Sequence, residues 1–215
     1  MHLLGIFKGQ PIMAGLFLIS AIAYLVMPAD LSPGAMVFLK PMPVVLLSLS
    51  LRLKRGFHPL FFGLWFSALG DIFLLNKAQF FLLGMGAFAL AHLLYIAFFW
   101  LVLKQKIWIL LWPFAAWAIG LLTWLWPGLG EMRIPVCVYG SLLCSMMWLA
   151  ASWAWARPRK TWPFALLGGL CFGISDSLLA IALFKTDFAG SNLAIMLTYW
   201  LGQWGITSAG ASDER

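Results

Sequence analysis

Two carboxylates lie inside long apolar stretches of this sequence. Asp71 falls within GLWFSALGDIFLL and Asp176 within GGLCFGISDSLLA. A charged side chain at the centre of a membrane helix costs roughly 2.5–3.5 kcal/mol on insertion scales, so we expect a chain that keeps two of them to use them. Lys40 and His92 also lie in apolar stretches. Carboxyl groups and histidines carry out general acid and base chemistry, so the pattern predicts a polar site inside a bundle of membrane helices.

Other polar side chains share helix faces with these groups. Ser67 lies four residues before Asp71, and Tyr95 lies three residues after His92; residues at these spacings are neighbours on one helix face. Tyr139 adds a hydroxyl on a separate apolar stretch. The last candidates are Asn192, Tyr199 and Gln203, which are separated by seven and four residues. These spacings predict one polar stripe along a helix, and we expect the stripe to face inward.

Several of these residues also have a purely structural interpretation. Lys40 precedes Pro41 and Pro43, which disrupt helical hydrogen bonding, and the alternative role of Lys40 is a lysine that snorkels to the membrane boundary. The alternative for Asp71 is an interfacial carboxylate or a helix–helix hydrogen bond. Interhelical hydrogen bonding is the alternative for Tyr139, and a packed, hydrogen-bonded histidine is the alternative for His92. Asp176 is the deepest of the carboxylates and is the hardest to explain in this way.

The composition predicts an integral membrane protein. Of the 215 residues, 63% are hydrophobic and only 10% are charged, whereas soluble domains carry about 25% charged residues. The three cysteines, Cys137, Cys144 and Cys171, lie in apolar runs without metal-ligand pair spacing. No second histidine stands at metal spacing from His92, so we predict neither a metal site nor a cofactor.

The apolar runs predict an all-α, polytopic membrane helix bundle that forms a single transmembrane domain over residues 1–215. Breaks at short polar, Pro or Gly clusters divide the chain into eight predicted spans: 11–28, 36–53, 58–75, 79–103, 107–126, 133–156, 162–184 and 190–208.

The positions of lysines and arginines predict the orientation of these spans. With the N-terminus inside, the outer loops hold only Lys77, Arg133 and Lys185. The inner segments hold Lys8, Arg52, Lys54, Arg55, Lys104, Lys106, Arg157, Arg159, Lys160 and Arg215. The positive-inside rule then predicts cytoplasmic termini and puts Lys40, Asp71, Tyr139 and Asp176 in the outer half of the membrane. The net charge of +7 is therefore a topology signal, and we expect no nucleic-acid partner.

A weak internal repeat relates the two carboxylates. Aligning Asp71 with Asp176 also matches Gly63 with Gly168. A duplicated four-helix unit with parallel topology would produce this pattern.

The chain resembles the YhhN-like family of lysoplasmalogenase-type membrane proteins. The motifs that carry the resemblance are LKPMPVVLLSLSLR, FSALGDIFLL, FLLGMGAFALAHLLYI and FGISDSLLAI, followed by the span with Tyr199. The resemblance implies eight membrane helices and hydrolysis of the vinyl-ether bond of lysoplasmalogens to a fatty aldehyde and a glycerophospho-headgroup. A lysophospholipid substrate, surrounding membrane lipid and a bacterial cytoplasmic (inner) membrane location are the corresponding expectations.

Two carboxyl groups suit this reaction, much as two carboxyl groups suit glycoside cleavage. Burial favours the neutral form of a carboxyl group and a nearby cation favours its ionised form. We expect Asp176 to donate a proton and Asp71, nearer Lys40, to act as base or stabiliser, although the reverse assignment is open. His92 and Tyr139 would orient water or a carboxylate, and Lys40 is also a candidate for holding the lipid phosphate.

Two other classes of function remain open at this point. Intramembrane Asp, Lys and His residues also mark ion paths, so the main alternative is a small-molecule or lipid transporter with proton coupling through the same carboxylates. A structural or assembly factor would tolerate Asn at Asp71 and Asp176.

Overall fold

The chain folds into helices joined by short connections in a computed structural model that describes residues 5–27, 33–56, 58–156 and 162–212. The described residues contain no strand. The α-helices are α1 (Pro11–Val26), α2 (Pro33–Leu39), α3 (Met42–Arg55), α4 (Pro59–Phe73), α5 (Lys77–Val102), α6 (Leu111–Leu125), α7 (Arg133–Ala156), α8 (Trp162–Phe184) and α9 (Ser191–Ala211). The 3-10 helices are η1 (Gly5–Phe7), η2 (Leu74–Asn76), η3 (Trp108–Leu110), η4 (Trp126–Gly128) and η5 (Gly130–Met132).

Helices are the expected outcome for these apolar runs, because a segment in lipid must satisfy its own backbone hydrogen bonds. Prolines stand in the first turn of α1, α3 and α4, where the missing N–H has no helical partner to lose. The predicted disturbance at Pro41 and Pro43 is confirmed: α2 ends at Leu39 and α3 begins at Met42.

Helical segments long and apolar enough to cross a membrane are found at five places in the described ranges: Gly34–Arg55, Pro59–Val102, Trp108–Gly128, Gly130–Ala156 and Pro163–Phe184. The apolar helix Pro11–Val26 is shorter. The segment Pro59–Val102 has 44 residues, about twice what a bilayer core of ~30 Å needs. It contains α4 and α5, which correspond to two predicted spans. The structure is therefore consistent with a membrane helix bundle, and the count of eight spans stays a prediction.

The topology prediction depends partly on Arg157, Arg159, Lys160 and Arg215. These four residues lie outside the described residues.

The chain divides into two compact units. The first unit holds residues 1–98 and 207–215, and the second unit holds residues 99–206. Each is described by itself below.

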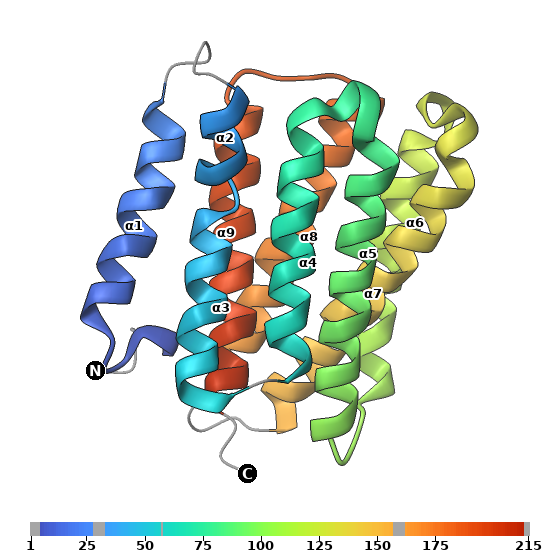
Figure 1. Cartoon of the computed structure of the whole chain (residues 1–215). Coiled ribbons are helices and arrows are strands. Elements are labelled where there is room, and N and C mark those ends of the chain that lie inside the picture. Colours follow the sequence, from blue (N-terminus) through green and yellow to red (C-terminus); the bar gives the residue numbers. More distant parts are fainter. Residues whose placement is uncertain (1–4, 28–32, 57, 157–161, 213–215) are drawn as a thin grey trace. The chain divides into compact units, whose positions relative to one another are not determined.

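In the first unit, α3 packs against both α1 and α4, and α4 and α5 form an antiparallel pair (Figure 1). The close approach of this pair depends on glycines, because a Cβ at Gly70 would lie 2.5 Å from the ring of Phe88. Two hydrogen bonds, each between a side chain and a backbone group, connect the end of α9 to the rest of this unit. Ser208 Oγ accepts from the Ile6 N–H at 2.9 Å, and Arg55 Nε donates to the Ala211 carbonyl at 2.9 Å.

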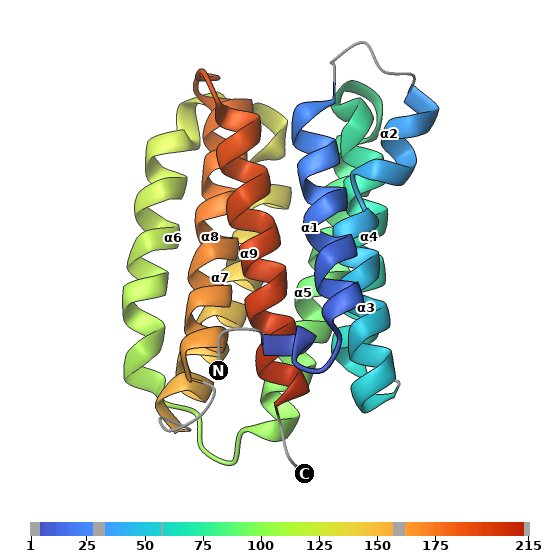
Figure 2. The ribbon, with the colours of Figure 1, turned by 90° about the vertical axis from the view of Figure 1, so that its left-hand side faces the viewer.

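In the second unit, α6, α7 and α8 follow one another as antiparallel neighbours, and α9 returns beside α8 (Figure 2). The contact between α8 and α9 is backbone to backbone. A Cβ at Gly168 would lie 2.5 Å from the Ile206 nitrogen, and one at Gly202 would lie 2.8 Å from the Phe172 nitrogen. Glycines at such crossings let membrane helices approach closely, and here they hold α8 at a defined height against α9.

Candidate functional site

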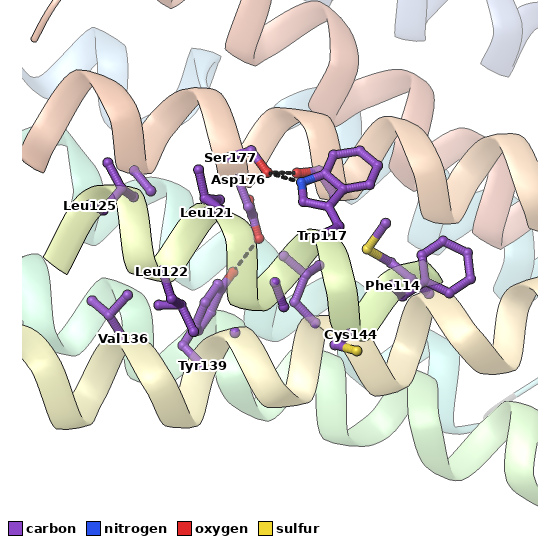
Figure 3. Close-up of a pocket in the computed structure, with 16 residues that line it drawn as sticks. Phe114, Trp117, Leu121, Leu122, Leu125, Val136, Tyr139, Cys144, Asp176 and Ser177 are labelled. Atoms are coloured by element: carbon purple, nitrogen blue, oxygen red, sulfur yellow. Dashed lines mark hydrogen bonds between the residues drawn. The ribbon is translucent and has the colours of Figure 1, made fainter. Parts of the chain in front are cut away.

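A pocket lies between α6, α7 and α8 of the second unit (Figure 3). Its empty volume is about 530 Å³, including the open space at its mouth. The lining side chains are mostly apolar. Those from α6 are Phe114, Trp117, Ala118, Leu121, Leu122 and Leu125. Those from α7 are Val136, Tyr139, Gly140, Leu143, Cys144 and Met147, and those from α8 are Gly173, Asp176, Ser177 and Ala180.

Asp176 is the only carboxylate among the lining residues, and its partner is Tyr139. The Tyr139 hydroxyl donates to Asp176 Oδ2 at 2.6 Å (Figure 3). Hydrogen bonds to a carboxylate are short and strong relative to those between neutral groups. Both side chains are partly exposed, so the carboxyl group is accessible from the pocket. The two residues are 37 positions apart, and the packing of α7 against α8 brings them together.

Trp117 and Ser177 form a second polar contact in the pocket. Trp117 Nε1 donates to Ser177 Oγ at 3.1 Å, and the Ser177 hydroxyl donates to the Gly173 carbonyl at 2.7 Å. These bonds hold the indole ring at the pocket wall beside Asp176 (Figure 3). Trp117 is not among the residues predicted from the sequence. The available signal was an indole in the middle of an apolar run, where the membrane interface cannot account for it.

The glycines before Asp176 bring α8 close to α7. A Cβ at Gly169 would lie 3.1 Å from Ala150 Cβ, and one at Gly173 would lie 2.6 Å from Met147 Sδ. Two small residues at this spacing are typical of membrane helix contacts. Met147 is therefore part of the pocket wall, although the sequence pattern did not indicate it.

The predicted site residues of the first unit form a second polar cluster. Lys40, Asp71, Ser67, His92 and Tyr95 are all buried. Ser67 Oγ and the Tyr95 hydroxyl lie 3.2 Å apart, in a hydrogen bond between α4 and α5. The charges of Lys40 and Asp71 interact. With only 7% of its surface exposed, Lys40 does not behave as a lysine that snorkels to water.

The ring of His92 lies near that of Tyr95, with centroids 6.3 Å apart. No group of three or more His, Cys, Asp or Glu residues that could hold a metal occurs within the described part of the chain.

The predicted stripe on α9 is inward-facing at two of its three positions. Tyr199 and Gln203 are buried, and the Tyr199 ring contacts Phe172 with centroids 5.6 Å apart. Asn192 is exposed, so the prediction that it faces inward is wrong. The residue follows Ser191, where α9 begins, and an amide at a helix end can stay in contact with solvent or headgroups.

The predicted site residues are divided between the two compact units. Tyr139 and Asp176 belong to the second unit, as do Tyr199 and Gln203; Lys40, Ser67, Asp71, His92 and Tyr95 belong to the first. A shared site of Asp71 and Asp176 stays a prediction.

Comparisons with known proteins agree on one family. The YhhN family model matches residues 34–210. The membrane protein YhhN of Escherichia coli O157:H7 is 30% identical over 146 residues, which are 66% of this chain and 69% of that protein. The human lysoplasmalogenase TMEM86B is 34% identical over 146 residues, or 66% of this chain and 58% of the human protein.

A lysoplasmalogenase of Mycobacterium tuberculosis is 33% identical over 128 residues, or 56% of this chain and 45% of the relative. No solved structure matches the chain. The family match covers most of the sequence, including both aspartates and the whole pocket, and the composition and helices fit a membrane location. The chain therefore belongs to the YhhN family and is an integral membrane protein.

Proposed function

We propose that this protein is a lysoplasmalogenase-type hydrolase that cleaves the vinyl-ether bond of a lysoplasmalogen. The observation that carries the proposal is the hydrogen bond between Tyr139 and Asp176 at the wall of an apolar pocket. Relatives named lysoplasmalogenase, 33–34% identical to this chain, support the substrate class. An accessible acid beside an apolar cavity suits a substrate with a hydrocarbon chain and an acid-labile ether.

The reaction begins with proton transfer from the Asp176 carboxyl to the vinyl carbon remote from the ether oxygen. With Oδ2 accepting the Tyr139 proton, Oδ1 is the oxygen that can carry the transferred proton. The alkenyl group becomes an oxocarbenium ion, and the new Asp176 carboxylate is stabilised by the Tyr139 hydroxyl. Water adds to the cationic carbon and returns a proton to a carboxylate. The hemiacetal then collapses to the fatty aldehyde and the free glycerol hydroxyl.

Asp71 is the second carboxyl group of the proposed mechanism. Its electrostatic partner is buried Lys40, and the mechanism takes Asp71 to be ionised, because a nearby cation favours the ionised form of a carboxyl group. An ionised Asp71 would stabilise the cationic intermediate or accept a proton from water, and His92, Ser67 and Tyr95 would hold that part of the site in place. This role requires the two aspartates to face one reaction centre.

The proposed topology has eight spans with both termini in the cytoplasm and places the protein in a bacterial cytoplasmic (inner) membrane. Asp176 would then lie in the half of the membrane away from the cytoplasm, where a lysolipid of the outer leaflet can reach it.

Aldehyde release from a purified lysoplasmalogen by the protein in detergent tests the proposal. We expect the wild-type protein to release aldehyde without a membrane gradient, and Asp176→Asn and Asp71→Asn each to lose more than about 100-fold in kcat, the usual scale for a general acid or base. Asp187→Asn is the matched control, because Asp187 is an exposed carboxylate beyond α8.

The possible outcomes separate the parts of the proposal. If a folded Asp71→Asn or Asp176→Asn variant keeps near-normal turnover, the mechanism with two aspartates is wrong. If the wild-type protein releases no aldehyde in detergent but moves lipid or protons in sealed vesicles, the protein is a carrier instead.

A further inference from the structure

The pocket of the second unit is long and has its polar group nearer one end. Its lining on α6 runs from Phe114 to Leu125, and eleven residues at ~1.5 Å each make ~16 Å. A Cβ at Gly140, next to Tyr139, would lie 3.8 Å from Leu122 Cδ1. The pair of Tyr139 and Asp176 is therefore about three residues from the Leu125 end and about eight residues, or ~12 Å, from the Phe114 end.

The two ends of the pocket lie on opposite sides of its carboxyl group. Phe114 and Cys144 lie on one side of Asp176 and Tyr139, and Leu125 and Val136 lie on the other (Figure 3). Phe114 and Met147 are buried at 8% and 5% exposure, and Leu125 and Val136 at the other end are buried at 1% and 8%. Tyr139 and Asp176, which lie between the ends, are partly exposed. The pocket is accessible near its carboxyl group and closed at its Phe114 end.

We propose that this pocket binds the single hydrocarbon chain of a lysophospholipid, with the first carbons at Asp176 and the methyl end against Phe114 and Met147. The identity of the lipid rests on the proposed function. The assignment makes the residues at the closed end the determinants of chain length.

An apolar chain is the occupant that this shape and lining favour. Beyond Asp176 toward Phe114 the walls are apolar except for the bonded pair of Trp117 and Ser177, so a polar ligand would find few partners there. Each methylene buried in such a channel tightens binding by about fourfold. The gain ends where Phe114 and Met147 close the pocket.

Positive charge stands at the opposite end, as a phosphate requires. Arg133 begins α7 six residues before Tyr139, and Lys185 directly follows α8, nine residues after Asp176. These separations are ~9 Å and ~13 Å along the helices, and long side chains span part of each. Arg133 lies over the Trp126 ring at 5.0 Å and Lys185 over the Trp124 ring at 5.7 Å. A phosphate beside these cations leaves its glycerol directed toward Asp176.

Binding of lysophospholipids with a saturated 1-O-alkyl chain tests the inference without any hydrolysis. We expect the affinity of the wild-type protein, measured by displacement of a fluorescent lysolipid in detergent, to rise with chain length and then reach a plateau. Ala118→Trp puts a large ring into the pocket and should weaken binding of the longest chain more than about tenfold. Ile119→Trp is the matched control, because Ile119 is the next residue on α6 and is 62% exposed.

A second variant tests the closed end. Phe114→Ala should move the plateau to longer chains while binding of short chains stays unchanged. Equal effects of Ala118→Trp and Ile119→Trp, or a plateau that Phe114→Ala does not move, would overturn the pocket assignment. Should alkyl lysolipids bind with the expected pattern while no lysoplasmalogen is cleaved, the proposed function fails and the binding site stands. If Ala118→Trp leaves the cleavage of a lysoplasmalogen unaffected, the proposed function stands and the pocket assignment fails.

Discussion

Asp176 and Asp71 are both membrane carboxylates, but their surroundings differ. Asp176 is partly exposed, receives a hydrogen bond from Tyr139 and lines an apolar pocket. Asp71 is only 2% exposed, and the charge of Lys40 interacts with it. A group that transfers a proton to substrate must be reached by substrate. At the scale of single residues, these surroundings agree with the proposal that Asp176 donates the proton, and the role of Asp71 stays a prediction.

Tyr139→Phe tests the role of the hydrogen bond to Asp176. Loss of a hydrogen bond to a charged group costs about 1.5–3 kcal/mol, so we expect kcat for aldehyde release to fall about 10- to 100-fold while KM changes little. Ser141→Ala is the control, because its exposed hydroxyl only bonds the Cys137 carbonyl of its own helix at 2.8 Å. An unchanged kcat in Tyr139→Phe would show that the phenol does not support the reacting carboxyl group.

Lys40→Met tests whether the buried cation balances Asp71. Removing one partner of a buried charged pair costs about 3–5 kcal/mol, whereas replacing both charges costs far less. We therefore expect the single variant to lower the melting temperature by many degrees in a thermal unfolding assay in detergent. The double variant Lys40→Met/Asp71→Asn should recover much of that loss. Additive losses from the two single substitutions would show that these charges do not interact.

At the scale of helices, glycines set the contacts that hold the polar residues in register. Gly63 admits the ring of Tyr95 between α4 and α5, and Gly168 admits the backbone of Ile206 between α8 and α9. Each glycine precedes an aspartate by eight residues, as the weak sequence repeat predicts. Both units thus contain an antiparallel helix pair with a close glycine contact two turns from the carboxylate.

Gly168→Ala tests the importance of this close packing. A Cβ at Gly168 would lie 2.5 Å from the Ile206 nitrogen and 2.8 Å from the Gly205 carbonyl carbon. These are backbone atoms, so α8 and α9 must separate, and we expect a loss of about 1–3 kcal/mol in unfolding free energy. Gly120→Ala in α6 is the control, because its Cβ would meet nothing within 4 Å. Alanine there should be neutral or stabilise the helix by up to ~1 kcal/mol. If both variants unfold at the same temperature, the glycine contact does not limit the packing.

At the scale of the whole molecule, the chain combines two compact units in one membrane protein. The predicted shared site requires Asp71 of the first unit and Asp176 of the second to act on one substrate. The predicted topology places both in the outer half of the membrane, which is a necessary condition for such a site.

Reporter fusions test that topology. We expect alkaline phosphatase to be active when it is fused after Lys185 and inactive when it is fused after Lys104, because the positive-inside rule places these segments on opposite sides. Green fluorescent protein fused at the C-terminus should be fluorescent, since the terminus is expected in the cytoplasm. Activity at both loop fusions would mean that the number of spans between them is even.

Much of the helix pattern was predictable from the sequence. Every predicted span overlaps helical residues, the span 36–53 covers both α2 and α3, and the disturbance at Pro41 and Pro43 occurs where it was expected. The number of spans stays a prediction. The candidate residues are also recognisable in the sequence, because a charged or polar side chain in an apolar run stands out, and their roles stay predictions. Trp117 and Met147 did not stand out, since both are ordinary residues in a membrane helix, and only their positions at the pocket make them important. Asn192 was misjudged because spacing alone does not tell where a helix begins.

The sequence by itself determined the membrane location, the helices and the short set of groups that can do chemistry. It could do so because a segment in lipid must satisfy its backbone hydrogen bonds internally, so local composition decides its structure. Only the tertiary structure decided which groups meet. Gly168 and Gly169 are adjacent in sequence, yet the first faces α9 and the second faces α7. That choice depends on side-chain packing between helices, and it brings Tyr139 to Asp176 and forms the pocket beside them.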